Sequence, residues 1–197
     1  MNVAAIILAA GASRRMGSPK ALLEWEGQTF LDRWIAMFAE VCNPVVVVLG
    51  HDRDVVRAGL RQMHLARLTM NQDPDRGMLS SLQCGLRALP DDVPGFLFTP
   101  VDQPAVASGT VARLVEAATD GALVAVPCYG GRRGHPVYCS AALIPDFLAL
   151  PSSAQARDVI RAHHEQTRYL DVDDPGVVTD VDYPADYQRL LASARPS

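Results

Sequence analysis

VAAIILAAGASRRMGSPK, residues 3–20, joins a short apolar run to a loop of small and basic residues. Residues 3–8 are apolar without interruption, which is typical of a strand in a parallel sheet covered on both faces. Residues 9–11 are Ala-Ala-Gly, so a ligand can approach the main chain closely, and successive N–H groups of such a loop can bind an anion. Arg15 and Lys20 add positive charge to the same loop. The stretch therefore predicts a strand that leads into a phosphate-binding loop.

The spacing of this loop differs from that of the common phosphate-binding motifs. Gly11 and Gly17 precede Lys20 without matching the Walker pattern, and the loop holds no Gly-x-Gly-x-x-Gly sequence. We therefore expect a different phosphate-binding design. The alternative is an ordinary connection from strand to helix that carries solvated arginines.

Apolar runs and helix-period segments alternate along the rest of the chain. We expect strands at residues 3–8, 45–49, 66–70, 96–99 and 122–126. We expect helices at residues 30–38, 54–62, 79–88, 110–118, 153–163 and 185–194, with Ser152 and Gln155 as a capping box for the fifth. This alternation predicts a single α/β domain, residues 1–197, in which a doubly wound, mostly parallel sheet is flanked by helices in a Rossmann-like fold. Ligands are then expected beyond the carboxyl ends of the strands.

Composition limits the class of protein. The chain has 197 residues, of which 49% are hydrophobic, so it can bury one sizeable core and is not disordered for most of its length. Eighteen basic and 22 acidic residues give a net charge of −4, so we expect neither nucleic acid nor a membrane surface as a partner. The basic residues are 17 arginines and a single lysine, Lys20.

The same sequence bears on where the protein works. Its apolar runs fall far short of the roughly 20 residues that span a bilayer, and no basic segment of a secretory signal precedes the first of them, so we expect a cytoplasmic protein. Cys42, Cys84, Cys128 and Cys139 form no C-x-x-C pair, and we interpret them as reduced packing residues.

Four further segments accompany the first loop. They are residues 71–82, which end in Gly77-Met78-Leu79-Ser80-Ser81-Leu82, then Val101-Asp102-Gln103-Pro104, Arg133-Gly134-His135-Pro136-Val137, and Asp180-Val181-Asp182-Tyr183-Pro184-Ala185-Asp186. Together with the pattern Leu8-Ala9-Ala10-Gly11-x-Ser13-x-Arg15-Met16-Gly17-x-x-Lys20, and in this order, they resemble the molybdenum cofactor nucleotidyltransferase family. The chain is most similar to the cytidylyltransferase branch of that family, and the resemblance covers nearly its whole length.

The resemblance implies a set of site residues. The nucleotide is expected to contact Leu8, Ala9, Ala10, Gly11, Ser13, Arg15, Gly17, Lys20, Asn71, Gly77, Ser80, Ser81 and Asp102, and the acceptor to contact Gly134, His135 and Pro136. Catalysis is expected to depend on Arg15, Lys20 and Asp102. Residues 1 to about 104 would bind the nucleotide, and residues from about 105 to 190 would bind the acceptor and close the site. A histidine before a proline is also common in turns that have no such role.

Asp102 stands out by its position as well. It follows an apolar strand by a few residues, so its carboxylate is expected at the carboxyl edge of the sheet, where Mg²⁺ could use it together with phosphates and water. The alternative is an aspartate that caps a turn or a helix. The resemblance implies Asp182 as the second metal ligand, although Tyr183 stands where the family more often has Thr. Asp180 and Asp186 remain candidates for that role.

The reaction implied by the resemblance uses Mg²⁺ as cofactor. A phosphate oxygen of the acceptor attacks the α-phosphorus of a nucleoside triphosphate, and pyrophosphate leaves. Ala10 favours CTP, because the guanylyl branch usually carries glycine at that position. The expected acceptor is the phosphate of molybdopterin or the molybdenum cofactor, and a molybdoenzyme is a candidate recipient of the product.

Three alternatives remain. A cytidylyl- or uridylyltransferase acting on a sugar or polyol phosphate would use the same loop, metal and mechanism. A GTP-using guanylyltransferase would differ in the base that it selects. A non-catalytic protein that carries the nucleotide or the cofactor would need no metal-bound α-phosphate, so Arg15, Lys20 and Asp102 together favour an enzyme.

Overall fold

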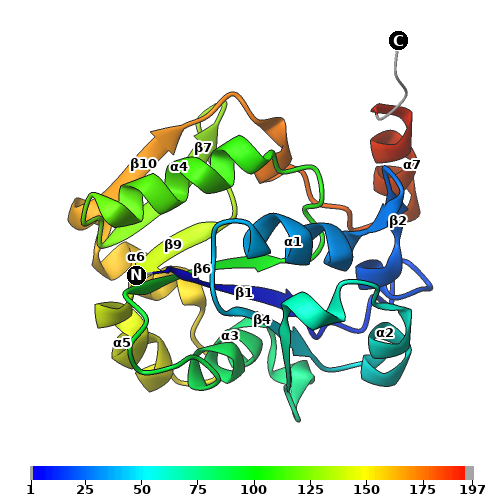
Figure 1. Ribbon diagram of the computed structural model, residues 1–197, viewed down its shortest axis with the longest axis horizontal. Coiled ribbons are helices and arrows are strands. Elements are labelled where there is room, and N and C mark those ends of the chain that lie inside the picture. Colours follow the sequence, from blue (N-terminus) through cyan, green and yellow to red (C-terminus); the bar gives the residue numbers. More distant parts are fainter. Residues whose placement is uncertain (1, 194–197) are drawn as a thin grey trace.

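A mixed sheet with helices on both faces forms the centre of the protein (Figure 1). The structure, a computed structural model, describes residues 2–193. Its strands are β1 (Ala4–Ala9), β2 (Glu24–Trp25), β3 (Gln28–Thr29), β4 (Val45–Leu49), β5 (Arg67–Met70), β6 (Gly95–Pro100), β7 (Val124–Tyr129), β8 (Arg132–Arg133), β9 (Val137–Ser140) and β10 (Thr167–Asp171). Its α-helices are α1 (Phe30–Ala39), α2 (Arg53–Gly59), α3 (Met78–Arg87), α4 (Ser108–Thr119), α5 (Ile144–Ala149), α6 (Ala156–Ala162) and α7 (Pro184–Ser193).

The strands of the large sheet lie in the order β10-β7-β9-β6-β1-β4-β5, and β8 pairs with β7. β1 is parallel to both of its neighbours, β4 and β6, and β4 is parallel to β5. β9 runs antiparallel between β6 and β7, so the sheet is mostly but not wholly parallel. The chain moves away from β1 on one side through β4 and β5 and returns on the other side with β6. The loops after β1, β4 and β6 therefore meet at one edge, where open α/β sheets bind their ligands.

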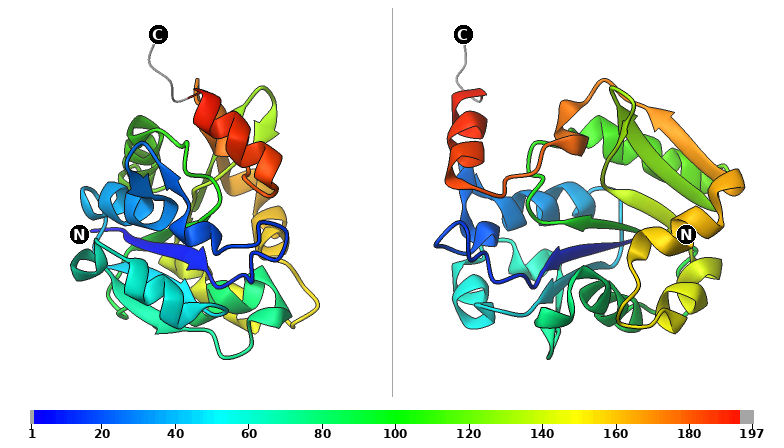
Figure 2. Two further views of the ribbon diagram at one scale, coloured as in Figure 1. Left: turned by 90° about the vertical axis from the view of Figure 1, so that its right-hand side faces the viewer. Right: turned by 180° about the vertical axis from the view of Figure 1, so that it is seen from behind.

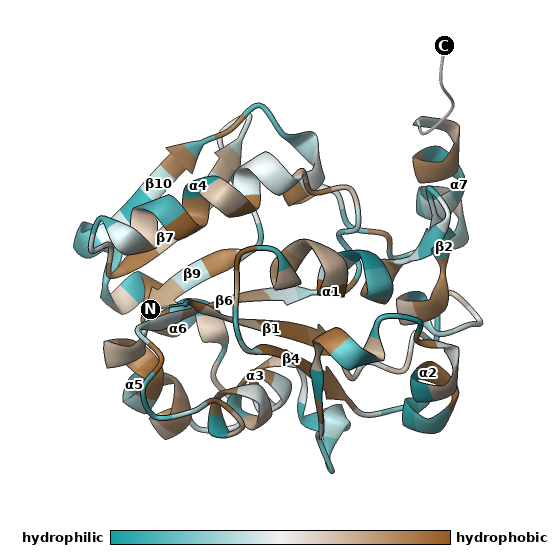
Figure 3. Ribbon diagram, in the orientation of Figure 1, coloured by the Kyte–Doolittle hydropathy of each residue, from teal (hydrophilic) through white to brown (hydrophobic). Residues whose placement is uncertain are grey.

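Two apolar cores lie on the two faces of the sheet. Ala5 and Ile7 of β1 face a core that includes the buried residues of α1 and α4. Ile6 and Leu8 face the opposite core, with buried residues of α3, α5 and α6. Figure 3 shows that the central strands β1 and β4 are mostly apolar. The uninterrupted apolar sequences of β1 and β4 follow from this burial on both faces.

The structure confirms the predicted elements with small shifts at their ends. The five predicted strands are β1, β4, β5, β6 and β7, and the six predicted helices are α1, α2, α3, α4, α6 and α7. The predicted last residue of the final helix, Ala194, lies outside the described residues. β2, β3, β8, β9, β10 and α5 were not predicted from the sequence pattern.

The capping box predicted at Ser152 and Gln155 is wrong. α6 begins at Ala156, and the backbone N–H of Gln155 donates to the carboxylate of Asp158 at 2.7 Å. The preceding residues form a turn instead of a helix, because the N–H of Ala154 donates to the carbonyl of Pro151 at 3.0 Å. The cap therefore lies three residues later than the sequence pattern indicated.

The end of the described chain packs beside its beginning. The hydroxyl of Tyr187 in α7 donates to the carbonyl of Glu24 in β2 at 2.6 Å, and Figure 2 shows α7 next to this strand at the rim of the molecule. All four cysteines are free, as predicted, and Cys42, Cys128 and Cys139 are buried. Among residues 2–193, no helix is long and apolar enough to span a membrane.

Candidate active site

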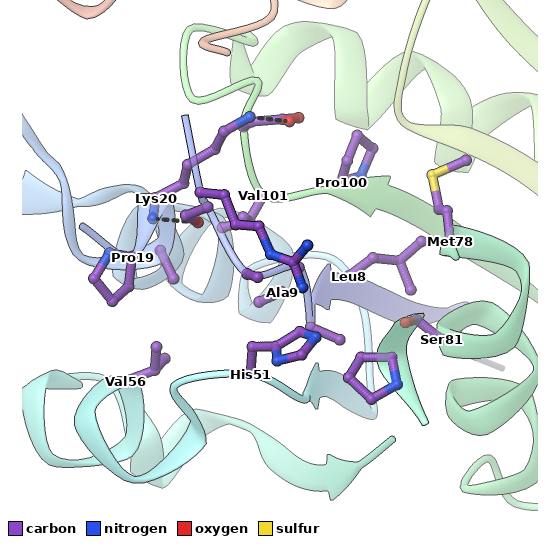
Figure 4. Close-up of a pocket in the computed structure, with 18 of the residues that line it drawn as sticks. Leu8, Ala9, Pro19, Lys20, His51, Val56, Met78, Ser81, Pro100 and Val101 are labelled. Atoms are coloured by element: carbon purple, nitrogen blue, oxygen red, sulfur yellow. Dashed lines mark hydrogen bonds and ion pairs between the residues drawn. The ribbon is translucent and has the colours of Figure 1, made fainter. Parts of the chain in front are cut away.

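A pocket of about 410 Å³ opens beyond the carboxyl ends of β1, β4 and β6 (Figure 4). Ten of the thirteen residues predicted to contact the nucleotide line it, namely Leu8, Ala9, Ala10, Gly11, Ser13, Arg15, Lys20, Gly77, Ser81 and Asp102. Asp182 lines it too and is the only contributor from beyond Asp102 among the described residues. The structure thus brings the first loop, the Gly77 segment and the two predicted metal ligands to one cavity.

The loop after β1 is folded back on itself by Ser13. The Ser13 hydroxyl accepts a hydrogen bond from the N–H of Lys20 at 2.9 Å, and its carbonyl accepts one from the N–H of Met16 at 2.9 Å. Gly17 has a φ of +72°, a conformation that L side chains rarely adopt. Gly17 does not line the pocket, so the structure supports a role in turning the loop rather than a ligand contact.

Asn71 and Ser80 are buried and line a second pocket instead of this one. The Asn71 side-chain amide donates to Ser80 Oγ at 2.9 Å and to Ser81 Oγ at 3.0 Å, while Ser80 Oγ donates to the carbonyl of Gly77 at 2.8 Å. Both side chains were expected to face the nucleotide, but these bonds direct them at the protein itself. They hold the start of α3 and leave Gly77 and Ser81 at the pocket surface.

Sequence reasoning missed the contribution of the loop after β4. A Cβ atom built on Gly50 would lie 2.7 Å from the carbonyl oxygen of Ala10 and 2.9 Å from Cβ of Pro74, so three loops touch at this glycine. The backbone N–H of His51 donates to the same Ala10 carbonyl at 3.1 Å, and the His51 side chain lines the pocket. The sequence signal that could have identified this loop is its position: residues 50 and 51 directly follow the apolar strand 45–49, which ends at the same sheet edge.

Lys20 lies between the two predicted metal ligands. Its Nζ donates to Asp102 Oδ2 at 3.0 Å and to Asp182 Oδ1 at 2.6 Å, and its side chain is only 13% exposed. Burial works against the charge of Lys20, but the two carboxylates outweigh it and raise the pKa of the ammonium group. Burial also raises the pKa of Asp102, against the opposing effect of Lys20. A neighbouring cation therefore favours the charged form of Asp102.

The other two aspartates of the late acidic segment, Asp180 and Asp186, accept hydrogen bonds from groups other than Lys20. Asp180 accepts a hydrogen bond from the side-chain amide of Gln103 at 2.6 Å. Asp186 accepts from the backbone N–H groups of Asp182 and Tyr183, at 3.0 and 2.7 Å, and so caps the start of α7. Asp182 is the member of this group that reaches Lys20, which favours it over its two competitors as a metal ligand.

The two carboxylates fit a divalent cation. Asp102 and Asp182 already converge on one positive atom, the Lys20 ammonium nitrogen, which stands in for such an ion. Mg²⁺ commonly binds through one or two carboxylates and completes its coordination with phosphates and water. Among residues 2–193, no group of three or more His, Cys, Asp or Glu residues could hold a metal by itself. The chemistry of the pair suits an ion that is shared with a substrate.

Arg15 reaches the same region from the other side of the loop. Its guanidinium carbon lies 5.2 Å from the centre of the Tyr183 ring, a cation–π contact. The late segment that supplies Asp182 thus holds a second basic residue of the phosphate-binding loop.

The predicted acceptor residues lie in the turn between β8 and β9, outside the nucleotide pocket. A Cβ atom on Gly134 would lie 2.1 Å from the carbonyl oxygen of Val177, so only glycine fits there. The ring of His135 packs edge-on against Phe98 of β6. Burial lowers the pKa of His135 to about 4 despite the charge of Asp180, so the ring is neutral at pH 7. Pro136 follows His135 and is buried.

A loop of small residues, a lysine and two carboxylates lie together at the switch point of a doubly wound sheet, and this arrangement fits a nucleotidyltransferase. A family model described as "MobA-like NTP transferase domain" matches residues 5–167, and the chain belongs to this family.

Two relatives with named activities match most of the chain. It is 25% identical over 184 residues to the molybdenum cofactor cytidylyltransferase of Escherichia coli K12, an alignment that covers 92% of each protein. A Bacillus cytotoxicus protein named "Probable molybdenum cofactor guanylyltransferase" is 29% identical over 136 residues, which are 67% of this chain and 65% of that protein.

Solved structures agree with the fold. The structure of Rv0371c from Mycobacterium tuberculosis H37Rv superposes with a TM-score of 0.84 at 26% identity and covers 98% of both chains. A second structure of Rv0371c is a complex with manganese, with a TM-score of 0.77 at 25% identity over 98% of this chain and 100% of that one.

Proposed function

We propose that the protein transfers CMP from CTP to the phosphate of a molybdopterin-type acceptor and releases pyrophosphate. The observation that carries this proposal is the convergence of Lys20, Asp102 and Asp182 on a pocket whose floor is the small-residue backbone of residues 8–11. A cation and two carboxylates beside an anion-binding loop suit the charges of a triphosphate and its metal ion.

The groups of the chain have separate tasks in this reaction. The loop N–H groups, Arg15 and Lys20 bind the phosphates and offset the charge that develops on the departing pyrophosphate. Asp102 and Asp182 hold Mg²⁺, which supplies charge neutralisation at the phosphates when it is bound. An oxygen of the acceptor phosphate forms a bond to the α-phosphorus while the bond from that phosphorus to the pyrophosphate oxygen breaks. No covalent intermediate with the protein is needed.

Two observations support CTP as the donor. Ala10 lines the pocket at the position where glycine is usual in the guanylyl branch. The Escherichia coli cytidylyltransferase matches over 92% of this chain at 25% identity, whereas the probable guanylyltransferase of Bacillus cytotoxicus matches over 67% at 29% identity. The manganese complex of Rv0371c supports the use of a divalent cation, and we propose Mg²⁺ as the ion that serves here.

The acceptor would bind on the side of the carboxylates that faces the β8–β9 turn. Gly134, His135 and Pro136 lie there, and the charge of Asp180 acts on His135. The lining of the pocket supports the division of the chain, since all of it except Asp182 comes from residues 8–102. A molybdoenzyme is the proposed recipient of the product.

The test measures pyrophosphate release by the purified protein with Mg²⁺, molybdenum cofactor as acceptor, and CTP, GTP, UTP or ATP in turn. We expect CTP to be preferred by about tenfold or more, a difference that a base-selective pocket commonly provides. Asp102→Asn should abolish turnover, whereas Asp91→Asn, a matched change at an exposed aspartate far from the pocket, should not.

The other outcomes separate the alternatives. A clear preference for GTP would contradict the choice of base. Turnover with sugar or polyol phosphates but not with the cofactor would point to the first rival activity. Tight nucleotide binding with no turnover on any acceptor would point to a carrier.

A further inference from the structure

Every basic side chain of the first loop is paired with a group from another part of the chain. Arg14 lies 3.6 Å from Asp75, Arg15 lies over the ring of Tyr183, and Lys20 bridges Asp102 and Asp182. The first pair is exposed, with 78% of the Arg14 side chain and 69% of the Asp75 side chain accessible, so water screens it. The Lys20 cluster is better shielded, with 13% of the Lys20, 23% of the Asp102 and 45% of the Asp182 side chain accessible.

The position of Lys20 conflicts with the binding of a metal ion. Its Nζ lies within hydrogen-bond distance of one oxygen of each carboxylate, at 3.0 and 2.6 Å. A divalent cation held by both carboxylates would occupy the same space and would repel the ammonium group. The lysine and the metal therefore cannot share this position, and one must leave before the other binds.

The surroundings of Lys20 also offer a second binding position for its ammonium group. The lysine follows the anion-binding part of the loop, and its backbone N–H is anchored to Ser13 at 2.9 Å, so the stem of the side chain can turn while the loop stays in place. A compact ammonium on a flexible stem can exchange a carboxylate for a phosphate more readily than a planar guanidinium can. A bound triphosphate would place such phosphates against residues 11–15, 19 and 20, which line the same pocket.

We propose that Lys20 is a positioning residue as well as a phosphate ligand. In the metal-free enzyme its ammonium group holds Asp102 and Asp182 together. When a nucleotide draws the ammonium group away, the divalent cation takes its place between the two carboxylates. This inference rests on the metal site of the proposed function. The inference couples the binding of nucleotide and divalent cation. The nucleotide removes Lys20, which competes with the metal for the two carboxylates, and the metal likewise frees Lys20 to bind the phosphates. Such coupling is reciprocal by necessity.

The first test measures Mn²⁺ binding alone, from the electron paramagnetic resonance signal of the free ion. Lys20→Met keeps much of the side-chain volume but removes the charge, and we expect it to bind Mn²⁺ about tenfold or more tightly than the wild type when no nucleotide is present. Arg14→Met removes the same charge from the same loop, outside the cluster, and should change the affinity less than about twofold. Unchanged or weaker Mn²⁺ binding by Lys20→Met would overturn the proposal.

A second measurement avoids any variant that fails to fold. Lys20 is the only lysine of the chain, so wild-type protein labelled with ¹⁵N- and ¹³C-lysine carries one side-chain ammonium signal. That signal should report an ion-paired ammonium in the metal-free protein and should shift when CTP and Mg²⁺ are added together. A signal that stays unchanged at saturating CTP and Mg²⁺ would also overturn the proposal.

Failure of this inference is distinguishable from failure of the proposed function. If Lys20 does not compete with the metal, the wild-type enzyme still turns over CTP and the cofactor. If the protein has no transferase activity, the Mn²⁺ titrations of Lys20→Met and Arg14→Met still report whether Lys20 closes the site.

Discussion

Gly50→Ala is expected to damage the nucleotide pocket without touching any charged group. The new Cβ would lie 2.7 Å from the Ala10 carbonyl oxygen, 2.8 Å from Ala10 Cβ and 2.9 Å from Pro74 Cβ. All three distances are shorter than side-chain carbons tolerate. Two of the atoms belong to Ala10, which directly follows β1 and has no side-chain rotamer that would move them away. The strain must therefore be relieved by moving a loop.

Overpacking of this kind typically costs about 1–3 kcal/mol of folding free energy. In a domain of this size, each kcal/mol lowers the midpoint of thermal unfolding by about 2–4 °C, so we expect a decrease of about 2–12 °C. The same shift separates the Ala10 carbonyl from the N–H of His51, which are 3.1 Å apart. Since a misplacement of about 1 Å can cost about a hundredfold in rate, kcat/KM for the nucleotide should fall by about tenfold or more.

The assay pairs calorimetry with steady-state kinetics. Gly109→Ala is the matched control, because Gly109 is exposed in α4 and a Cβ there would meet no atom within 4 Å. It should raise stability by up to about 1 kcal/mol and leave kinetics unchanged. If Gly50→Ala keeps both the unfolding temperature and the KM of the wild type, the convergence of the three loops is not what shapes the pocket.

Four further expectations follow from the site. Lys20→Ala should lower kcat by about a hundredfold or more, the effect of removing one electrostatic contact to a transition state, and full activity of Lys20→Arg would show that the lysine itself is not required. Tyr183→Leu should raise the KM for the nucleotide by about two- to fivefold through loss of the contact with Arg15. Tyr183→Phe keeps a ring and should leave this KM unchanged. Equal effects of the two variants would refute the cation–π role. Ala10→Gly should raise the GTP to CTP ratio of kcat/KM, and an unaltered ratio would remove Ala10 from base selection. The pKa of His135 is about 4 in the folded protein, below its ordinary value, so the unfolded chain binds more protons at acidic pH. Stability should therefore fall as the pH drops from about 6.5 to 4. This fall should be smaller in His135→Asn when unfolding temperatures are compared across that range.

Much of the fold follows from local patterns in the sequence. Residues 45–49 are five consecutive apolar residues, and the structure buries all of them in a parallel strand covered on both faces. The apolar stripe of residues 30–38 likewise faces the core. β10 gave no such signal, because it is an edge strand with mostly exposed residues and therefore carries few apolar side chains.

The candidate site was predictable as a set of residues but not as a set of contacts. Its motifs follow strands that end at one sheet edge, so their convergence could be expected. Side-chain direction could not: Asn71 and Ser80 stand beside the pocket in sequence, but their hydrogen bonds turn them into the protein. The bond between Lys20 and Asp182 joins residues 162 positions apart, and only the folded chain brings them together.

The most direct test of the proposed reaction follows the α-phosphorus. CTP labelled with ³²P at the α-position is incubated with the protein, Mg²⁺ and molybdenum cofactor, and the products are separated. Transfer of CMP predicts that the label appears in a cytosine dinucleotide of the pterin while unlabelled pyrophosphate is released in equal amount. Label that remains in CTP, or that reaches only a sugar or polyol phosphate, would contradict the proposed function.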